Sequence, residues 1–201
     1  MILTISNVLT AIRFVLAPVF LYLFFSDSQT MRLAATFAFI IGAITDHYDG
    51  KLARRRKETT EFGKFADPLA DKLLTLSAFI AILLREDFKG LFVFVLAYII
   101  IIAVREFGVT FLRMWAITKS TPVITSIWGK LKTTFQLFAI IFSLVYFNAR
   151  DLLPELGVRI NLLQDTYFIP LIHFLILLSM IITVISGVLY LSPSSYEVKT
   201  K

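Results

Sequence analysis

Six apolar stretches, separated by short polar connections, make up most of the 201-residue chain. An α-helix needs about 20 residues to cross the hydrocarbon part of a bilayer, and the predicted helices are of this order. The pattern predicts an all-α integral membrane protein with six transmembrane helices in a single domain, residues 1–201. The predicted spans are 8–25, 33–55, 67–84, 91–117, 127–147 and 167–191, and the longest polar connection is predicted at 148–166.

Composition agrees with a bilayer as the solvent of this chain. Hydrophobic residues make up 58% of the sequence, with 20 Phe, which is too apolar for an ordinary water-soluble domain. The sequence has no cysteine, so disulfides are excluded. The net charge of +6 matters less than the positions of the charges along the chain.

An even number of spans places both chain ends on one side of the membrane. On this topology all but five of the 20 Lys and Arg residues lie on the side of the chain ends; the five are Arg32, Arg85, Lys89, Arg150 and Arg159. Cytoplasmic segments of membrane proteins carry an excess of Lys and Arg. We therefore expect the chain ends, and with them segments 46–72 and 113–132, to face the cytoplasm.

Four aspartates stand beside apolar runs on that face. Asp46 and Asp49 are one helical turn apart, as are Asp67 and Asp71, so each pair shares a helix face. Carboxylates at such positions are costly and indicate function. Their mutual repulsion is relieved by cations, and an all-oxygen ligand set suits Mg²⁺ or Mn²⁺ better than zinc. Two such ions about 3.5–4 Å apart are a known arrangement for phosphoryl displacement.

The residues around the aspartates suit a phosphorylated substrate. Gly50, Ala53 and Gly63 lack bulk, so a nucleotide or diphosphate could approach the backbone closely. Arginine and lysine bind phosphate, arginine by a bidentate fork and lysine as a point charge. The candidates of this kind are Arg54, Arg105, Arg113, Lys130 and Lys132. The residues alone therefore indicate metal-dependent phosphotransfer onto or from a lipid at the membrane surface.

The spacing of these residues carries a family resemblance. Asp46-x-x-Asp49-Gly50-x-x-Ala53-Arg54, then eight residues, Gly63, three residues, Asp67, three residues and Asp71 resembles the signature of the CDP-alcohol phosphotransferases at all eight fixed positions. Three further patterns are similar to the branch of that family that makes phosphatidylglycerophosphate. They are Asn7-x-x-Thr10-x-x-Arg13, Arg105-Glu106 followed by Arg113, and Gly129-Lys130-x-Lys132-Thr133.

The resemblance implies a reaction and a set of roles. The enzyme would transfer the phosphatidyl group of CDP-diacylglycerol to sn-glycerol 3-phosphate and release CMP, in a bacterial-type cytoplasmic membrane and as a homodimer. Asp46, Asp49, Asp67 and Asp71 would hold two metal ions, and Asp71 would also be the general base. The CDP-lipid would meet Asn7, Thr10, Gly50, Ala53, Arg54, Thr60 and Gly63. We assign the acceptor phosphate to Arg105, Arg113, Lys130 and Lys132, because a phosphorylated acceptor needs cations that a neutral alcohol does not.

Less specific interpretations stand beside these. The four aspartates could be solvated acids at helix ends, and Arg105 and Arg113 could form a structural ion pair with Glu106. Lys130 and Lys132 are about 200° apart on a helix, so one of them could simply anchor lipid.

Other functions are also compatible with the pattern. The same chemistry could use inositol phosphate, serine or phosphatidylglycerol as acceptor. The acids could line a divalent-cation transporter, or the chain could be a scaffold without activity. No nucleic-acid polymer is expected as a partner.

Overall fold

The computed structural model describes residues 5–56, 61–118, 127–157 and 165–191, and it contains six α-helices and one short 3₁₀-helix over these ranges. Within the helices, the side chains of residues 5–9, 45–56, 61–65, 67, 117–118, 155 and 191 lie outside the description. The helices are α1 (Ile5–Phe24), α2 (Gln29–Arg56), α3 (Glu61–Leu83), η1 (Glu86–Leu91), α4 (Phe92–Thr118), α5 (Ile127–Glu155) and α6 (Asp165–Leu191).

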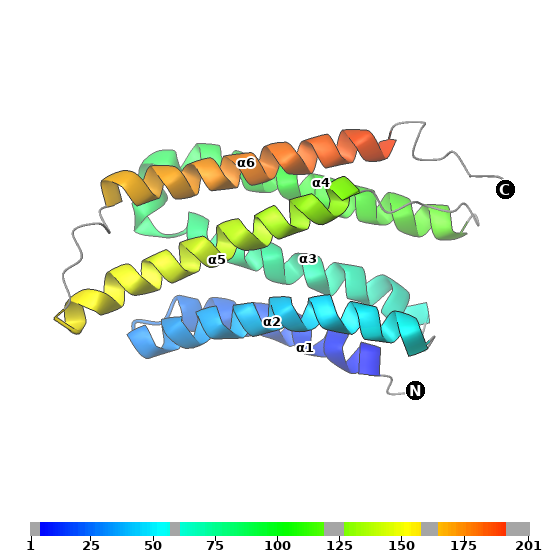
Figure 1. Ribbon diagram of the computed structural model, residues 1–201, viewed down its shortest axis with the longest axis horizontal. Helices are drawn as coiled ribbons and strands as arrows, with labels where there is room; N and C mark the ends of the chain where they lie inside the picture. Colours follow the sequence, from blue (N-terminus) through cyan, green and yellow to red (C-terminus); the bar gives the residue numbers. More distant parts are fainter. Residues whose placement is uncertain (1–4, 57–60, 119–126, 158–164, 192–201) are drawn as a thin grey trace.

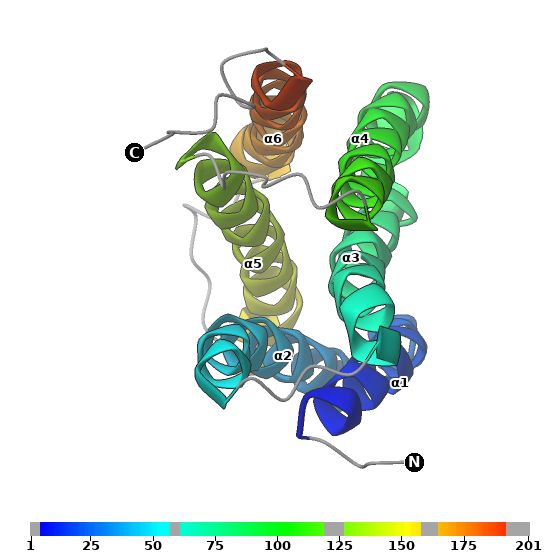
Figure 2. The same ribbon diagram turned by 90° about the vertical axis from the view of Figure 1, so that its right-hand side faces the viewer.

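The six long helices form a bundle in which the chain runs back and forth along one axis (Figure 1). Going around the bundle, the helices in contact are α1–α2, α2–α5, α5–α6, α6–α4, α4–α3 and α3–α1, and α3 also contacts α5 across the middle (Figure 2). The start of α1 and the end of α6 lie at the same end of the bundle, which we call the terminal end. The opposite end is called the distal end.

Helices α3 and α5 extend furthest beyond their predicted spans. Helix α3 begins at Glu61, so Pro68 lies inside the helix and not in its first turn. A proline without an N–H removes one backbone hydrogen bond there. Helix α5 continues to Glu155, into the segment predicted as a polar connection. Its polar residues are held by ion pairs described below, and the chain leaves the helix at Gly157, which has a left-handed φ of 75°.

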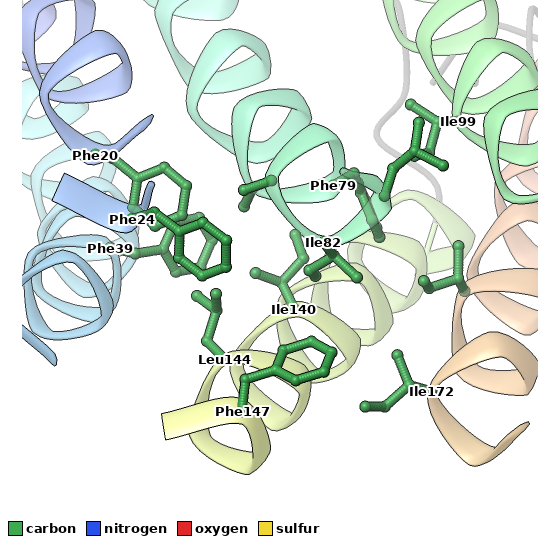
Figure 3. Close-up of a cluster of buried hydrophobic side chains, with 14 of the residues drawn as sticks. Phe20, Phe24, Phe39, Phe79, Ile82, Ile99, Ile140, Leu144, Phe147 and Ile172 are labelled. Carbon is green, nitrogen blue, oxygen red and sulfur yellow. The ribbon is translucent and has the colours of Figure 1, made fainter. Parts of the chain in front are cut away.

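The core is a cluster of aliphatic and aromatic side chains from all six helices and η1 (Figure 3). The rings of Phe20, Phe24 and Phe39 pack together where α1 meets α2, with the centroid of Phe20 5.7 Å from each of the other two. Phe79 and Ile82 of α3 are fully buried at the centre. Helix α3 therefore has an apolar half in the core and carries its aspartates on the half nearer the terminal end.

The surface of the bundle is apolar over long stretches. By length and composition, three helical segments of the described chain can cross a membrane: Glu86–Ala116, Ile127–Pro154 and Asp165–Tyr190. Helices α1 and α2 contain shorter apolar segments, Thr10–Phe24 and Gln29–Ile44. Large hydrophobic side chains point outward along the long segments, as lipid-facing residues do. The predicted all-α membrane fold is confirmed.

Charged residues at the distal end tie α2, α5, α6 and η1 together. Arg150 of α5 donates to Asp87 of η1 at 2.8 Å and to Asp165 of α6 at 2.9 Å. Arg85 donates to Asp87 at 3.0 Å and lies 3.5 Å from Asp151. We call Arg32, Arg85, Asp87, Arg150, Asp151 and Asp165 the distal network; Arg32 of α2 joins it 3.8 Å from Asp151.

Candidate active site

The two aspartate pairs lie on α2 and α3, towards the terminal end of the bundle. The side chains of Asp46, Asp49 and Asp67 lie outside the described residues, as do those of Gly50, Ala53, Arg54 and Gly63 on the helices and the whole of Thr60. What the structure gives for these positions is the course of the helix backbone. The predicted metal and CDP-lipid ligands there stay predictions.

Side chains of α1 and α3 pack beside Gly42 of α2, one turn before the first aspartate pair. A Cβ built on Gly42 would lie 2.7 Å from Leu16 Cδ2 of α1 and 3.2 Å from Leu74 Cδ2 of α3. Gly42 is one turn from Asp46, and Leu74 is about one turn from Asp71. Helices α2 and α3 both pack against α1 and both carry their aspartates towards the terminal end.

Helix α1 adds buried polar groups near this level. Thr10 is 1% exposed and Arg13 is 8% exposed, and both side chains have interaction partners in the fold. The side chain of Asn7, the third predicted residue of this motif, lies outside the described part of the chain. Buried polar residues in an apolar helix are costly, so α1 faces a polar interior here.

Of the four aspartates of the motif, Asp71 is the one whose side chain the structure describes. Lys72 connects it to a second group of charges. Lys72 Nζ donates to Asp71 Oδ2 at 2.6 Å and lies 3.4 Å from Glu106 Oε2 of α4. Both Asp71 and Lys72 are partly buried. The lysine therefore bridges the acid-bearing helix and the neighbouring helix α4.

Glu106 is the centre of this second group. It is 4% exposed and accepts a hydrogen bond from Lys132 Nζ of α5. Arg105 Nη1 lies 3.4 Å from Glu106 Oε1, and Gln136 Nε2 lies 3.5 Å from it. We call Lys72, Arg105, Glu106 and Lys132 the Glu106 cluster. Three cations share one buried carboxylate, so the cluster has an excess of positive charge in a poorly hydrated place.

Helix α6 supports the cluster from the other side. Arg105 Nη2 donates to Ser186 Oγ at 2.8 Å, and Gln136 Nε2 donates to Thr183 Oγ1 at 2.9 Å. The guanidinium of Arg113 lies 5.9 Å from the ring centroid of Tyr190. Sequence reasoning missed Lys72, Gln136 and these α6 residues. The available signal was the run of small and polar residues at helical spacing in an otherwise apolar segment.

The four predicted acceptor residues are divided into two groups. Arg105 and Lys132 meet at Glu106, so the predicted Arg105–Glu106 contact is present. Arg113 lies over Tyr190 and is exposed, and Lys130 is also exposed. The separation of Lys130 and Lys132 on the helix therefore places one lysine inside the bundle and the other on its surface.

The predicted donor set fits a hard divalent cation by its chemistry. Asp46, Asp49, Asp67 and Asp71 offer carboxylate oxygens only, the ligand type that Mg²⁺ and Mn²⁺ prefer. The side chain of Asp71 is within reach of solvent, with 32% of its surface exposed. These four residues are therefore suitable ligands for such an ion.

The comparison with known proteins gives the class of the protein. Residues 3–189 match the sequence model of the CDP-alcohol phosphatidyltransferase family. The match covers nearly the whole chain, so the protein belongs to this family. The family match includes α6, for which the sequence patterns gave no motif.

Individual relatives are bacterial proteins. The chain is 36% identical over 158 residues to a CDP-diacylglycerol–glycerol-3-phosphate 3-phosphatidyltransferase of Sodalis glossinidius, covering 78% of this chain and 84% of the relative. It is 37% identical over 138 residues to the protein of that name in Escherichia coli K12, covering 68% and 74%. A probable phosphatidylglycerophosphate synthase of Mycobacterium tuberculosis is 40% identical over 139 residues, covering 67% and 63%. The predicted family and enzyme class are confirmed.

Proposed function

We propose that the protein transfers the phosphatidyl group of CDP-diacylglycerol to sn-glycerol 3-phosphate, a step of phospholipid biosynthesis. The observation that carries the proposal is the buried cation excess at Arg105, Lys132 and Lys72, joined through Lys72 to Asp71. A site of this kind suits an acceptor that brings its own phosphate. The names of the relatives point to the same acceptor.

The reaction exchanges a phosphoanhydride bond for a phosphate ester bond. The acceptor hydroxyl oxygen forms a bond to the phosphorus that carries diacylglycerol, the bond from that phosphorus to CMP breaks, and the hydroxyl proton must be removed. We propose Asp71 as the general base, because a carboxylate within hydrogen-bond reach can take this proton. Its partner in the structure is Lys72 Nζ, at 2.6 Å.

The four aspartates are the proposed metal ligands. Asp46, Asp49, Asp67 and Asp71 would hold two Mg²⁺ or Mn²⁺ ions. When bound, such ions neutralise the diphosphate and stabilise the leaving CMP.

The two substrates are proposed to occupy neighbouring parts of the site. Asn7, Thr10, Gly50, Ala53, Arg54, Thr60 and Gly63 would line the CDP-lipid part. Arg105 and Lys132 would hold the acceptor phosphate, and the exposed Arg113 and Lys130 would attract it on approach.

Topology and assembly complete the proposal. All six helices would cross a bacterial-type cytoplasmic membrane, with both chain ends and the site on the cytoplasmic side, and two copies would form a homodimer. The common end of α1 and α6 and the excess of Lys and Arg on that side support the orientation.

A purified protein and a panel of acceptors test the function. With CDP-diacylglycerol and Mg²⁺, CMP release is expected with glycerol 3-phosphate and not with serine, inositol phosphate or phosphatidylglycerol. A chelator should stop the release, and Mg²⁺ or Mn²⁺ should restore it. Absence of CMP release with glycerol 3-phosphate would overturn the proposal, and metal flux into liposomes without CDP-lipid would favour a transporter.

A substitution tests the role of Asp71. Asp71→Asn keeps the size of the side chain and removes its basicity, so turnover should fall by about a thousandfold or more while the melting temperature stays close to that of the unchanged protein. Asp27→Asn, in the exposed turn after α1, is the matched control and should keep full turnover. Retained turnover in Asp71→Asn would remove this residue from the role of base.

A further inference from the structure

We infer that α6 positions the acceptor-binding arginine: Gly187 and Ser186 hold the side chain of Arg105, and through it they set the affinity for the phosphate of the acceptor. The inference rests on the proposed function of Arg105. It assigns a role to the last helix, in which the sequence analysis placed no functional residue.

Gly187 gives Arg105 the space it occupies. A Cβ built on Gly187 would lie 3.1 Å from Arg105 Cγ and 3.2 Å from Arg105 Nε. These distances are tighter than ordinary contacts, so the aliphatic part of the arginine lies directly against the backbone of α6. A Cβ at position 187 would require the arginine to move by a few tenths of an ångström, and a larger side chain would require a larger movement.

Ser186 fixes the end of the same side chain. Its hydroxyl accepts a hydrogen bond from Arg105 Nη2 at 2.8 Å. Nη1 makes a longer contact with Glu106, at 3.4 Å. Arg105 Nε is buried without a hydrogen-bond partner among the described residues. A guanidinium has five N–H donors in a planar fork. The guanidinium of Arg105 is therefore held in place while some of its N–H groups remain available to an anion.

The supporting residues form a single stripe of α6. Thr183, Ser186, Gly187 and Tyr190 follow the spacing i, i+3, i+4, i+7, which places them on one helix face. Thr183 accepts from Gln136, and Tyr190 lies below Arg113. One face of α6 thus contacts both arginines proposed to bind the acceptor.

A second glycine offers a matched control. Gly108 of α4 is three residues after Arg105, lies in a long apolar helix as Gly187 does, and is exposed. A Cβ built on Gly108 meets nothing within 4 Å. The same substitution at the two positions therefore separates displacement of Arg105 from the general effect of replacing a helical glycine.

The experiment compares Gly187→Leu with Gly108→Leu, using purified protein, CDP-diacylglycerol and glycerol 3-phosphate. Gly187→Leu should raise the KM for glycerol 3-phosphate about tenfold, the usual scale for a displaced charged hydrogen bond. Its KM for CDP-diacylglycerol should stay within about twofold, because the CDP-lipid residues are on other helices. Gly108→Leu should leave both KM values unchanged. A parallel rise of both KM values in Gly187→Leu, or equal behaviour of the two variants, would overturn the inference.

A milder variant and a binding measurement keep the test decisive if Gly187→Leu fails to fold. Ser186→Ala removes only the hydroxyl and should raise the KM for glycerol 3-phosphate several-fold, again without a change for CDP-diacylglycerol. Glycerol 3-phosphate should raise the melting temperature of the unchanged protein more than that of either variant. If the unchanged protein shows neither turnover nor stabilisation with glycerol 3-phosphate, the proposed function fails; if it shows both and the variants match it, only the role of α6 fails.

Discussion

The distal network and the Glu106 cluster are both groups of charges within an apolar bundle, but their charge balance differs. The distal network pairs three arginines with three aspartates. One of the arginines, Arg150, contacts all three aspartates, Asp87, Asp151 and Asp165. In the Glu106 cluster three cations share Glu106, with Asp71 as a second partner of Lys72. The distal charges satisfy one another, whereas the cluster at the other end retains positive charge that an anion could neutralise.

The difference shows how to separate structural from functional charges in this protein. Charges in a balanced group contribute mainly by tying helices together, and their loss should affect stability. Charges in an unbalanced group are costly to bury, and a bound anion would lower that cost. We therefore expect substitutions in the two groups to affect different measurements.

The largest effect is expected for Glu106→Gln. The change removes the carboxylate that Lys72, Arg105 and Lys132 share, and leaves one buried and two partly buried cations without it. Breaking a buried ion pair from one side costs about 3–5 kcal/mol, so the melting temperature and the turnover should both fall sharply. Thermal unfolding and CMP release measure the two effects. Glu86→Gln is the control, because Glu86 is 87% exposed; a stable, active Glu106→Gln protein would contradict the central role of this carboxylate.

A smaller effect, on stability alone, is expected for Arg150→Met. The change removes the contacts to Asp87 and Asp165 and leaves both aspartates less well paired. The loss should be about 2 kcal/mol in the free energy of unfolding, since the network is partly exposed and screened. The KM values for both substrates should stay the same in the remaining folded protein. A changed acceptor KM would show that the two charge groups are coupled through the bundle.

The third comparison uses two lysines of α5. Lys132 is buried on Glu106, and Lys130 is exposed on the helix surface. Lys132→Met should raise the acceptor KM about tenfold or more, while Lys130→Met should raise it by less, because an exposed charge acts through a screened field. Steady-state kinetics at two salt concentrations would separate them. The rise in acceptor KM should disappear at high salt for Lys130→Met and remain for Lys132→Met. If Lys130→Met raised the acceptor KM more than Lys132→Met, the exposed lysine would be the one that binds the acceptor.

The smallest effect is expected at an exposed pair of the distal end. Lys89 donates to Glu86 at 2.8 Å, but the two side chains are 74% and 87% exposed. Such surface pairs contribute little, so Lys89→Ala should change neither the melting temperature nor the kinetics. A measurable loss of stability would mean that the number of ion pairs at the distal end, and not their burial, determines their contribution to the free energy of unfolding.

The sequence predicted the number and type of the helices well, because long apolar runs are a strong signal. It placed the end of the fifth helix too early. Asn148, Arg150 and Asp151 look like a polar connection, but Asn148 is buried and donates to Thr36 at 2.7 Å, while the two charged residues are paired across helices. Such pairing joins residues distant in the chain, and hydropathy along a single segment cannot detect it. The start of the third helix was predicted too late, at residue 67; α3 begins at Glu61 and contains Pro68 in its interior.

The family of the protein was predictable from the spacing of its residues, whereas the roles of the individual aspartates stay predictions. The aspartate motif stands out in the sequence, and the family match supports it. The contacts of Arg105 with Ser186 and Gly187 were not predictable, because they join residues 81 and 82 positions apart. A serine and a glycine in an apolar helix look like ordinary small residues of helix packing. Their role depends on what lies opposite, which only the fold provides.

Gly42 has a consequence for how α2 packs against its neighbours near the aspartates. The space beside it is filled by Leu16 of α1 and Leu74 of α3. A larger residue would require these two leucine side chains to move, one turn before Asp46 and about one turn after Asp71. The packing of α2 at the height of the proposed metal ligands therefore depends on a residue that is itself no ligand in the proposal.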